Sequence, residues 1–366
     1  MKAAVLHEYG KPLVIEEVDI DEPREHEVTV KIIASGVCHS DYSFVTGKPY
    51  IQRDLPQVLG HEGAGVIVKV GKSVSSLSPG DHVVLSWVAV CGRCRNCTIG
   101  RPNICEVGRG TNVMSGNMPD GTRRISKGGK YYAHMGALST MAEYAVVPDV
   151  SAIKIDDDIP LEKAVLVGCA VMTGVGAVIN TAKVEMGSSL AVIGLGGVGM
   201  SAIQGASLVG ANPIIAVDVL PAKLEYACKM GATHTVDARA NMEKEIREIS
   251  PDGVDYIFEA AGNVDVMAKA YDLVKIGGTL VVVGAPPAGD VLSVPAWTFA
   301  LQEKTIRGSL YGSSRPNVDI PNLLRLYKAG KLLLDEMITR TYPLEHVGQA
   351  IADLGTGSNI RGVLKM

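Results

Sequence analysis

The chain has 366 residues, enough for two domains at about 150 residues each. Because 47% of its residues are hydrophobic and 20% are charged, the composition is globular and excludes a disordered chain. A formal net charge of −4, without a basic block, disfavours nucleic acid and membrane as partners. No apolar run reaches the roughly 18 residues of a membrane helix, and the N-terminus lacks a signal-peptide pattern. We therefore expect a soluble, cytoplasmic protein.

The first third of the chain shows short strands separated by turns. Alternating apolar residues predict strands at residues 28–34, 63–70 and 81–87, which indicates a β-rich domain. Residues 91–132 are rich in Gly, Arg and Asn and have little periodicity. An irregular segment of this length usually carries a metal, a function or disorder.

From about residue 170 onward, buried strands alternate with helices. Apolar runs predict strands at residues 189–194, 214–218, 256–259 and 279–284, with helices at 198–208, 222–230 and 264–274. Such alternation is typical of parallel βαβ units covered on both faces. The chain ends with predicted helices at 318–329 and 344–354 and a strand at 362–365.

A G-x-G-x-x-G motif follows the strand at 189–194 and opens the next helix; its residues are Gly194, Leu195, Gly196, Gly197, Val198 and Gly199. Its glycines permit a tight turn, close approach of the backbone to pyrophosphate and helix–strand packing. Asp218 ends the next strand, where it would accept hydrogen bonds from the adenosine ribose and favour NAD over NADP. Lys223 is placed to help at that ribose. A glycine-rich turn in a non-binding sheet is the alternative.

Four cysteines lie within fifteen residues of the irregular segment: Cys91, Cys94, Cys97 and Cys105. Four thiolates at this spacing can close a tetrahedron around Zn²⁺ and leave no open position, which predicts a structural zinc. Iron–sulfur ligation and unliganded cysteines are the alternatives. Cys38, His61 and Cys169 are further candidate ligands, although each taken singly is more often a core residue.

The segment around His61, which reads Gly60-His61-Glu62-x2-Gly65-x5-Gly71-x2-Val74, resembles the signature of the zinc-containing alcohol dehydrogenases of the medium-chain dehydrogenase/reductase family. The likeness extends over essentially the whole chain. It implies an α/β fold with two domains and an active site in the cleft between them. A GroES-like β-rich catalytic domain is expected at residues 1–170, completed by 312–366, and a doubly wound Rossmann domain that binds NAD at 171–311.

The resemblance implies that Cys38, His61 and Cys169 bind a catalytic zinc and leave a fourth position for water or substrate, which with the structural site makes two Zn²⁺ per chain. Hydride would then pass between an alcohol, or an aldehyde or ketone in reverse, and NAD. It also implies a proton relay at Ser40, an orienting acid at Asp41 and an acid beside the metal at Glu62. Cofactor contacts are expected at His39, Thr173, Val283, Ala285 and Arg361. Ser43 stands where many family members carry the last histidine of the relay.

The substrate pocket is expected to include Pro49, Trp87, His134 and Met135. Arg109 lies where thiol-adduct (formaldehyde-type) dehydrogenases of this family carry an anion-binding arginine, but Pro49 stands where an acid is expected with it. A thiol-adduct or sugar-alcohol dehydrogenase is therefore the alternative to general alcohol oxidation. A zinc-free enone reductase and a non-catalytic NAD-binding protein are more distant alternatives. The extended segment at residues 304–311 resembles the family's dimer edge, and we expect a homodimer.

Overall fold

The computed structural model describes residues 1–49 and 51–366. The chain divides into two compact units, which are described separately: unit 1 comprises residues 1–169, 315–330 and 334–366, and unit 2 comprises 170–314 and 331–333. The chain passes from unit 1 to unit 2 after residue 169, one residue before the expected boundary at 170/171. It returns to unit 1 after residue 314, three residues after the expected boundary at 311/312. Among the described residues, no single helix has the length and apolar character to cross a membrane, and one bent pair, Leu161–Gly168 with Ala170–Ala182, meets that test only jointly.

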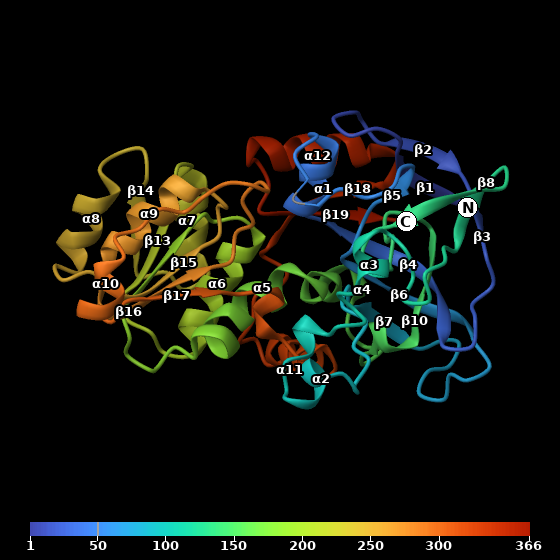
Figure 1. Ribbon diagram of the computed structural model, residues 1–366, viewed down its shortest axis with the longest axis horizontal. Coiled ribbons are helices and arrows are strands. Elements are labelled where there is room, and N and C mark those ends of the chain that lie inside the picture. The colour runs from blue at the N-terminus through green and yellow to red at the C-terminus, as the bar shows by residue number, and fades with distance from the viewer. Residues whose placement is uncertain (50) are drawn as a thin grey trace. The chain divides into compact units, whose positions relative to one another are not determined.

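Unit 1 is rich in strands and contains both chain ends (Figure 1). Its strands are β1 (Lys2–Leu6), β2 (Val14–Glu17), β3 (Asp19–Ile20), β4 (Glu27–Val37), β5 (Gln57–Val58), β6 (Gly63–Val70), β7 (His82–Leu85), β8 (Ile125–Lys127), β9 (Lys130–His134), β10 (Tyr144–Pro148), β11 (Ala152–Lys154), β18 (Ile338–Pro343) and β19 (Arg361–Lys365). Its helices are α1 (His39–Val45), α2 (Arg95–Thr98), η1 (Pro102–Ile104), α3 (Thr111–Met114), η2 (Asp149–Ser151), α4 (Leu161–Ala164), η3 (Val165–Gly168), α11 (Pro316–Lys328), η6 (Leu344–His346) and α12 (Val347–Thr356).

Strand β4 organises the core of unit 1. It pairs antiparallel with β6 and β10, and also with β19 from the other end of the chain. Val28, Val30 and Ile32 alternate along β4 and point into one apolar cluster. Because side chains alternate between the two faces of a strand, this spacing buries one face of β4 against its neighbours. The expected β-rich domain is confirmed, and its last strand comes from the C-terminus.

Unit 2 is a six-stranded parallel sheet in the order β14-β13-β12-β15-β16-β17. Its strands are β12 (Leu190–Ile193), β13 (Ile214–Asp218), β14 (His234–Asp237), β15 (Val254–Glu259), β16 (Val274–Val282) and β17 (Thr305–Gly308). Its helices are α5 (Ala170–Gly176), the π-helical η4 (Ala177–Ala182), α6 (Gly197–Leu208), α7 (Pro221–Lys229), α8 (Met242–Ile249), α9 (Val264–Leu273), α10 (Trp297–Leu301) and η5 (Tyr311–Ser313).

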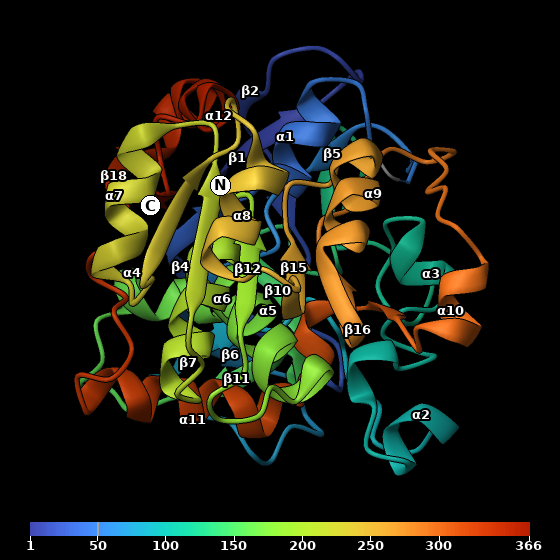
Figure 2. The same ribbon diagram turned by 90° about the vertical axis from the view of Figure 1, so that its left-hand side faces the viewer.

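Both faces of this sheet are covered by helices. Ala191 and Ile193 of β12 belong to the apolar cluster that also holds residues of α8 and α9. Val192 points to the other face, toward Gly199 of α6. This alternation explains the unbroken apolar runs in the sequence, since every residue of such a strand is buried. The expected doubly wound Rossmann-type domain is confirmed (Figure 2).

Candidate metal centres and cofactor site

Cys38, His61 and Cys169 converge inside unit 1. All three side chains are buried, and their ligand atoms lie within 4.8 Å of one another. The Sγ atom of Cys169 lies 3.3 Å from Nε2 of His61. Two sulfurs and one imidazole nitrogen suit Zn²⁺, whose tetrahedral donors are about 3–4 Å apart. The donors are thus gathered as a catalytic zinc with an open fourth position requires.

Local backbone features place these three donors. Cys38 is the N-cap of α1, and its backbone N–H donates to Oδ2 of Asp41 at 3.0 Å, as in a capping box. His61 follows Gly60, whose positive φ of 91° and close approach to Met141 leave no room for a side chain. Cys169 lies in the short break between η3 and α5.

Asp41 connects the first two donors. It accepts from Cys38, as above, and its Oδ1 accepts from the backbone N–H of Gly60 at 3.2 Å and lies 3.6 Å from Nδ1 of His61. Burial of His61 disfavours its charged form, but Asp41 and Cys38 together outweigh this and raise the pKa of His61 well above its ordinary value. The Asp41 side chain therefore lies where an acid that orients the histidine ring must be.

Glu62 and Arg361 form a buried ion pair beside these donors. The guanidinium of Arg361 donates through Nη2 to Oε2 of Glu62. Burial raises the pKa of Glu62 to about 7, although Arg361 opposes that shift. From the sequence, Glu62 is expected beside the metal and Arg361 at the cofactor, and this contact between them was missed. In the structure the Arg361 side chain is engaged with Glu62, and its expected contact with the cofactor stays a prediction.

The four clustered cysteines also come together, again with ligand atoms within 4.8 Å of one another. Cys94 Sγ lies 3.5 Å from Cys97 Sγ and 3.9 Å from Cys105 Sγ. Backbone N–H groups of Cys91 and Gly108 point at Cys105 Sγ at 3.3 and 3.4 Å. A hydrogen bond from the backbone of Glu106 is the main cause that lowers the pKa of Cys94, to about 6. Such N–H groups favour thiolates, the form that binds zinc.

The glycine motif lies between the end of β12 and the start of α6 in unit 2. Gly194 has a φ of 91°, and a Cβ at Gly199 would lie 1.9 Å from the carbonyl oxygen of Gly194. Both positions therefore require glycine, as the motif predicts. Asp218 Oδ2 accepts from the backbone N–H of Leu195 at 2.7 Å, and Oδ1 accepts from Leu220 N–H at 3.0 Å. The acid expected at the ribose thus also holds the glycine turn.

The other expected cofactor residues lie on the surface or near it. Lys223 is in the first turn of α7, and Thr173 is half-buried on α5. Val283 and Ala285 follow β16, at the carboxyl edge of the sheet where such folds bind ligands. In unit 1, His39 is exposed on α1, and Ser40 Oγ lies 3.9 Å from Cys38 Sγ. Their functional roles stay predictions.

Sequence comparison assigns both units to known families. The alcohol dehydrogenase GroES-like domain family matches residues 24–157, and the zinc-binding dehydrogenase family matches residues 197–329. The chain is 42% identical to the NDMA-dependent alcohol dehydrogenase of Amycolatopsis methanolica, covering 99% of this chain and 98% of that one. This chain is a zinc-containing alcohol dehydrogenase of the medium-chain dehydrogenase/reductase family. The resemblance stated from sequence is confirmed.

Two further relatives of this dehydrogenase differ in their named substrates. The S-(hydroxymethyl)glutathione dehydrogenase of Saccharomyces cerevisiae is 39% identical, covering 99% of this chain and 95% of that one. The crystal structure of benzyl alcohol dehydrogenase from Acinetobacter calcoaceticus superposes with a TM-score of 0.93 at 35% identity, covering 100% of this chain and 99% of that one. Membership establishes a zinc-dependent oxidoreductase that acts on alcohols with a nicotinamide cofactor.

The residues expected in the dehydrogenase's substrate pocket have different surroundings. Trp87 lies near the metal donors, because a Cβ at Gly136 would be 3.1 Å from Trp87 Cβ and 3.8 Å from His61 Cβ. The guanidinium of Arg109 lies over the Trp87 ring, 5.7 Å from its centroid.

His134 is fully buried: its Nε2 accepts from the backbone N–H of Arg124 at 3.0 Å, and Nδ1 lies 3.3 Å from Ser139 Oγ. Those contacts favour a structural role for the ring. Met135 is also buried, whereas Pro49 is half-buried.

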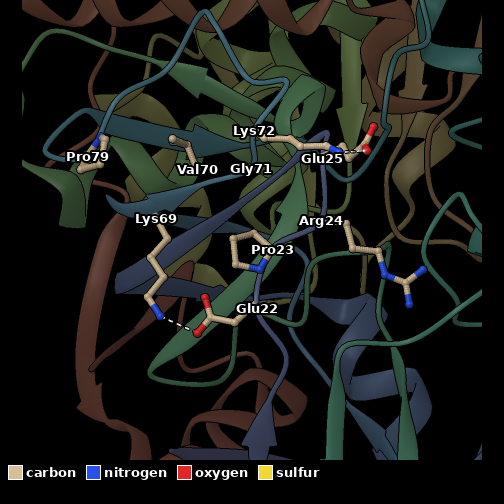
Figure 3. Close-up of a pocket in the computed structure, with 9 residues that line it drawn as sticks. All are labelled: Glu22, Pro23, Arg24, Glu25, Lys69, Val70, Gly71, Lys72 and Pro79. Carbon is tan, nitrogen blue, oxygen red and sulfur yellow. Dashed lines mark hydrogen bonds and ion pairs between the residues drawn. The ribbon is translucent and has the colours of Figure 1, made fainter.

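A surface hollow of about 550 Å³ occurs elsewhere in unit 1 of the dehydrogenase (Figure 3). It is lined by Glu22, Pro23, Arg24, Glu25, Lys69, Val70, Gly71, Lys72 and Pro79. Lys69 pairs with Glu22 at 2.6 Å, and Lys72 pairs with Glu25 at 2.5 Å (Figure 3). Because these charges neutralise each other and no metal donor lines the hollow, we do not assign the active site to it.

Proposed function

We propose that this protein is an NAD-dependent dehydrogenase of small alcohols, with a catalytic zinc held by Cys38, His61 and Cys169 and a structural zinc held by the four clustered cysteines. The observation that carries the proposal is the buried convergence of three donors with Asp41 behind His61. A zinc ion bound there supplies Lewis-acid polarisation of the substrate oxygen, and the nicotinamide supplies the hydride acceptor.

The chain's own residues bind and orient the reactants. Ser40, beside Cys38, is proposed to take the proton of the alcohol hydroxyl. Ser43 Oγ donates to the backbone oxygen of Ser40 at 2.8 Å, so its hydroxyl proton is engaged within α1. Proton release from Ser40 is then proposed to reach water directly. Asp218 is proposed to select NAD, because a carboxylate repels a 2′-phosphate.

A thiol-adduct dehydrogenase is the second candidate function. The supporting observation is Arg109, whose guanidinium lies over the ring of Trp87, a residue that packs near His61. We propose that this cation attracts an anionic substrate group. A relative at 39% identity is named for such a substrate. The absence of an acid at Pro49 argues against it, and we therefore place simple alcohols first.

The decisive experiment is an NADH-formation assay on the purified protein. The substrates are primary, secondary and benzylic alcohols and S-(hydroxymethyl)glutathione, each offered with NAD or NADP, and formation of NADH or NADPH is followed. A separate series adds NDMA as an alternative electron acceptor and follows its reduction, because the cofactor is then reoxidised and no NADH accumulates. We expect turnover of simple or benzylic alcohols with NAD. A preference for the glutathione adduct supports the second candidate, and no turnover of any alcohol contradicts both.

We also propose a homodimer formed through the sheet edge of unit 2. β17 is the last strand of that sheet, and an uncovered edge strand invites pairing. Four apolar residues of β16, α10 and the segment between them are exposed: Ile276 (75% exposed), Val291 (79%), Trp297 (56%) and Leu301 (77%). A second copy of the chain would cover this surface.

A further inference from the structure

A tight turn at residues 260–263 follows strand β15 in unit 2, and one buried carboxylate holds it closed. Glu259, the last residue of β15, is fully buried. Its Oε1 accepts from the backbone N–H groups of Ala261 at 2.9 Å, Gly262 at 2.8 Å and Asn263 at 3.4 Å. Without this acceptor, the N–H groups of these three part-buried hydrogen bonds would lose their partner within the protein.

The turn packs directly on the first glycine of the dinucleotide motif. A Cβ at Gly194 would lie 2.7 Å from the backbone nitrogen of Ala261 and 3.0 Å from the carbonyl carbon of Ala260. The backbone N–H of Ala260 also donates to the carbonyl of Ile193 at 2.8 Å. A shift of the turn must therefore move the glycine that starts the pyrophosphate-binding loop.

The opposite side of the same turn packs on the end of β16. A Cβ at Gly284 would lie 2.3 Å from the backbone nitrogen of Gly262 and 2.9 Å from Glu259 Oε2. The N–H groups of Val283 and Gly284 donate to the Glu259 carbonyl at 2.9 and 2.8 Å. This segment leads to Ala285, and the family resemblance implies cofactor contacts at Val283 and Ala285. Glu259 and the turn that it holds thus contact both the glycine loop and the segment after β16, where cofactor contacts are expected.

We propose that Glu259 is a positioning residue for the nicotinamide cofactor, because its carboxylate fixes the 260–263 turn between the glycine loop at Gly194 and the strand end at Gly284. The proposal rests on the proposed cofactor contacts. Glu259 Oε2 has no hydrogen-bond partner among the residues that the structure describes. Burial raises the pKa of Glu259 to about 7, although the three N–H groups oppose it. A carboxyl is costly at such a position, where an apolar side chain would satisfy packing alone.

The test compares three substitutions of Glu259 in the zinc-loaded full-length protein. Glu259→Gln keeps the length and an acceptor oxygen, Glu259→Asp keeps the charge but is one methylene shorter, and Glu259→Met keeps the length without an acceptor. Asp255→Asn is the matched control. Asp255 is the other acidic residue of β15 and lies at the opposite end of the strand, where its carboxylate accepts from Ser189 Oγ and pairs with Lys275.

NADH is the probe, and its dissociation constant is measured together with the KM for the alcohol at saturating NAD. We expect binding within about threefold of wild type for Glu259→Gln, about fivefold weaker for Glu259→Asp and at least about tenfold weaker for Glu259→Met. The KM for the alcohol should change by less than about threefold throughout, and Asp255→Asn should bind NADH normally. Amide hydrogen exchange at residues 261–263 and 194–196 should rise in the same order as the dissociation constants.

Two results would overturn the proposal. One is NADH binding by Glu259→Asp as tight as wild type; the other is binding by Glu259→Gln as weak as by Glu259→Met. If the methionine variant does not fold, the glutamine and aspartate variants decide. A wild-type protein that binds no NADH overturns the proposed function as well, whereas normal wild-type binding with an unchanged variant series overturns only this inference.

Discussion

Arg361, five residues from the C-terminus, donates to the carboxylate of Glu62, and both side chains are buried. Glu62 directly follows the candidate zinc ligand His61, and a Cβ at Gly36 would lie 2.5 Å from its side chain. The last strand of unit 1 is thereby connected to the metal centre. Because a buried charge without its partner is far more costly than the pair, this contact should couple the C-terminus to the stability of unit 1.

A double-mutant cycle tests this coupling. Arg361→Gln alone should lower the free energy of unfolding by about 3 kcal/mol, since it leaves the Glu62 carboxylate buried and unpaired. Glu62→Gln with Arg361→Gln should cost less than the sum of the two single changes. Urea denaturation of the zinc-loaded protein measures each value. Additive losses would show that the pair contributes no coupling energy.

Zinc content should separate the two metal centres. We expect two zinc ions per chain in the wild type, one in Cys169→Ser with loss of alcohol oxidation, and one in Cys94→Ser with a lowered melting temperature. Cys228→Ser is the control, because Cys228 is exposed and outside both clusters. Atomic absorption on dialysed protein gives the counts. Retention of two zincs by either of the first two variants would argue against that cluster as a site.

Asp218 should control the choice of cofactor. Asp218→Ala removes the expected ribose acceptor and also the carboxylate that accepts from Leu195, so kcat/KM with NAD should fall at least about tenfold. The ratio of NADP to NAD efficiency should rise, because the repulsion of a 2′-phosphate is gone. Glu225→Gln, an exposed change on α7, is the control. An unchanged cofactor ratio would remove Asp218 from the binding site.

Glu259 should make stability fall as the pH rises. Its folded-state pKa of about 7 exceeds the ordinary value of 4.5, so the folded protein binds this proton more tightly than the unfolded chain. The free energy of unfolding therefore falls as the pH rises from 4.5 to 7, and the loss persists above that range. Glu259→Gln has no carboxyl to titrate at this position. Its free energy of unfolding relative to wild type should therefore increase by about 2 kcal/mol from pH 5 to pH 8. Parallel unfolding curves with a constant difference at both pH values would contradict the shift.

The proposed dimer should depend on the apolar surface beside β17. Light scattering should give twice the 38.6 kDa chain mass for the wild type. Leu301→Asp should shift the protein toward the single-chain mass, because it buries a charge in the interface. Met186→Asp changes an equally exposed apolar residue elsewhere in unit 2 and should remain dimeric. A monomeric wild type would rule out this assembly.

The sequence determined the features that depend on nearby residues. The cysteine cluster, the glycine motif and the apolar strands of unit 2 were predictable because turn geometry, metal-ligand spacing and strand burial all act over short distances along the chain. Strand β6 and the helix α6 were placed within one residue of their observed bounds. The roles of Cys38, His61 and Cys169 came from family resemblance, since residues so far apart carry no local signal.

Tertiary structure decided the rest. Residues 91–132 have little periodicity, yet β8 and most of β9 form within them. The two strands pair with each other across Gly128 and Gly129, a local turn that the prediction missed, and β8 also pairs with β3 and β9 with β5 from elsewhere in the chain. The Arg361–Glu62 pair and the turn held by Glu259 also join segments whose proximity no local pattern encodes. Their energies come from burial and from hydrogen bonds in a low-dielectric interior, and these exist only once the chain has folded.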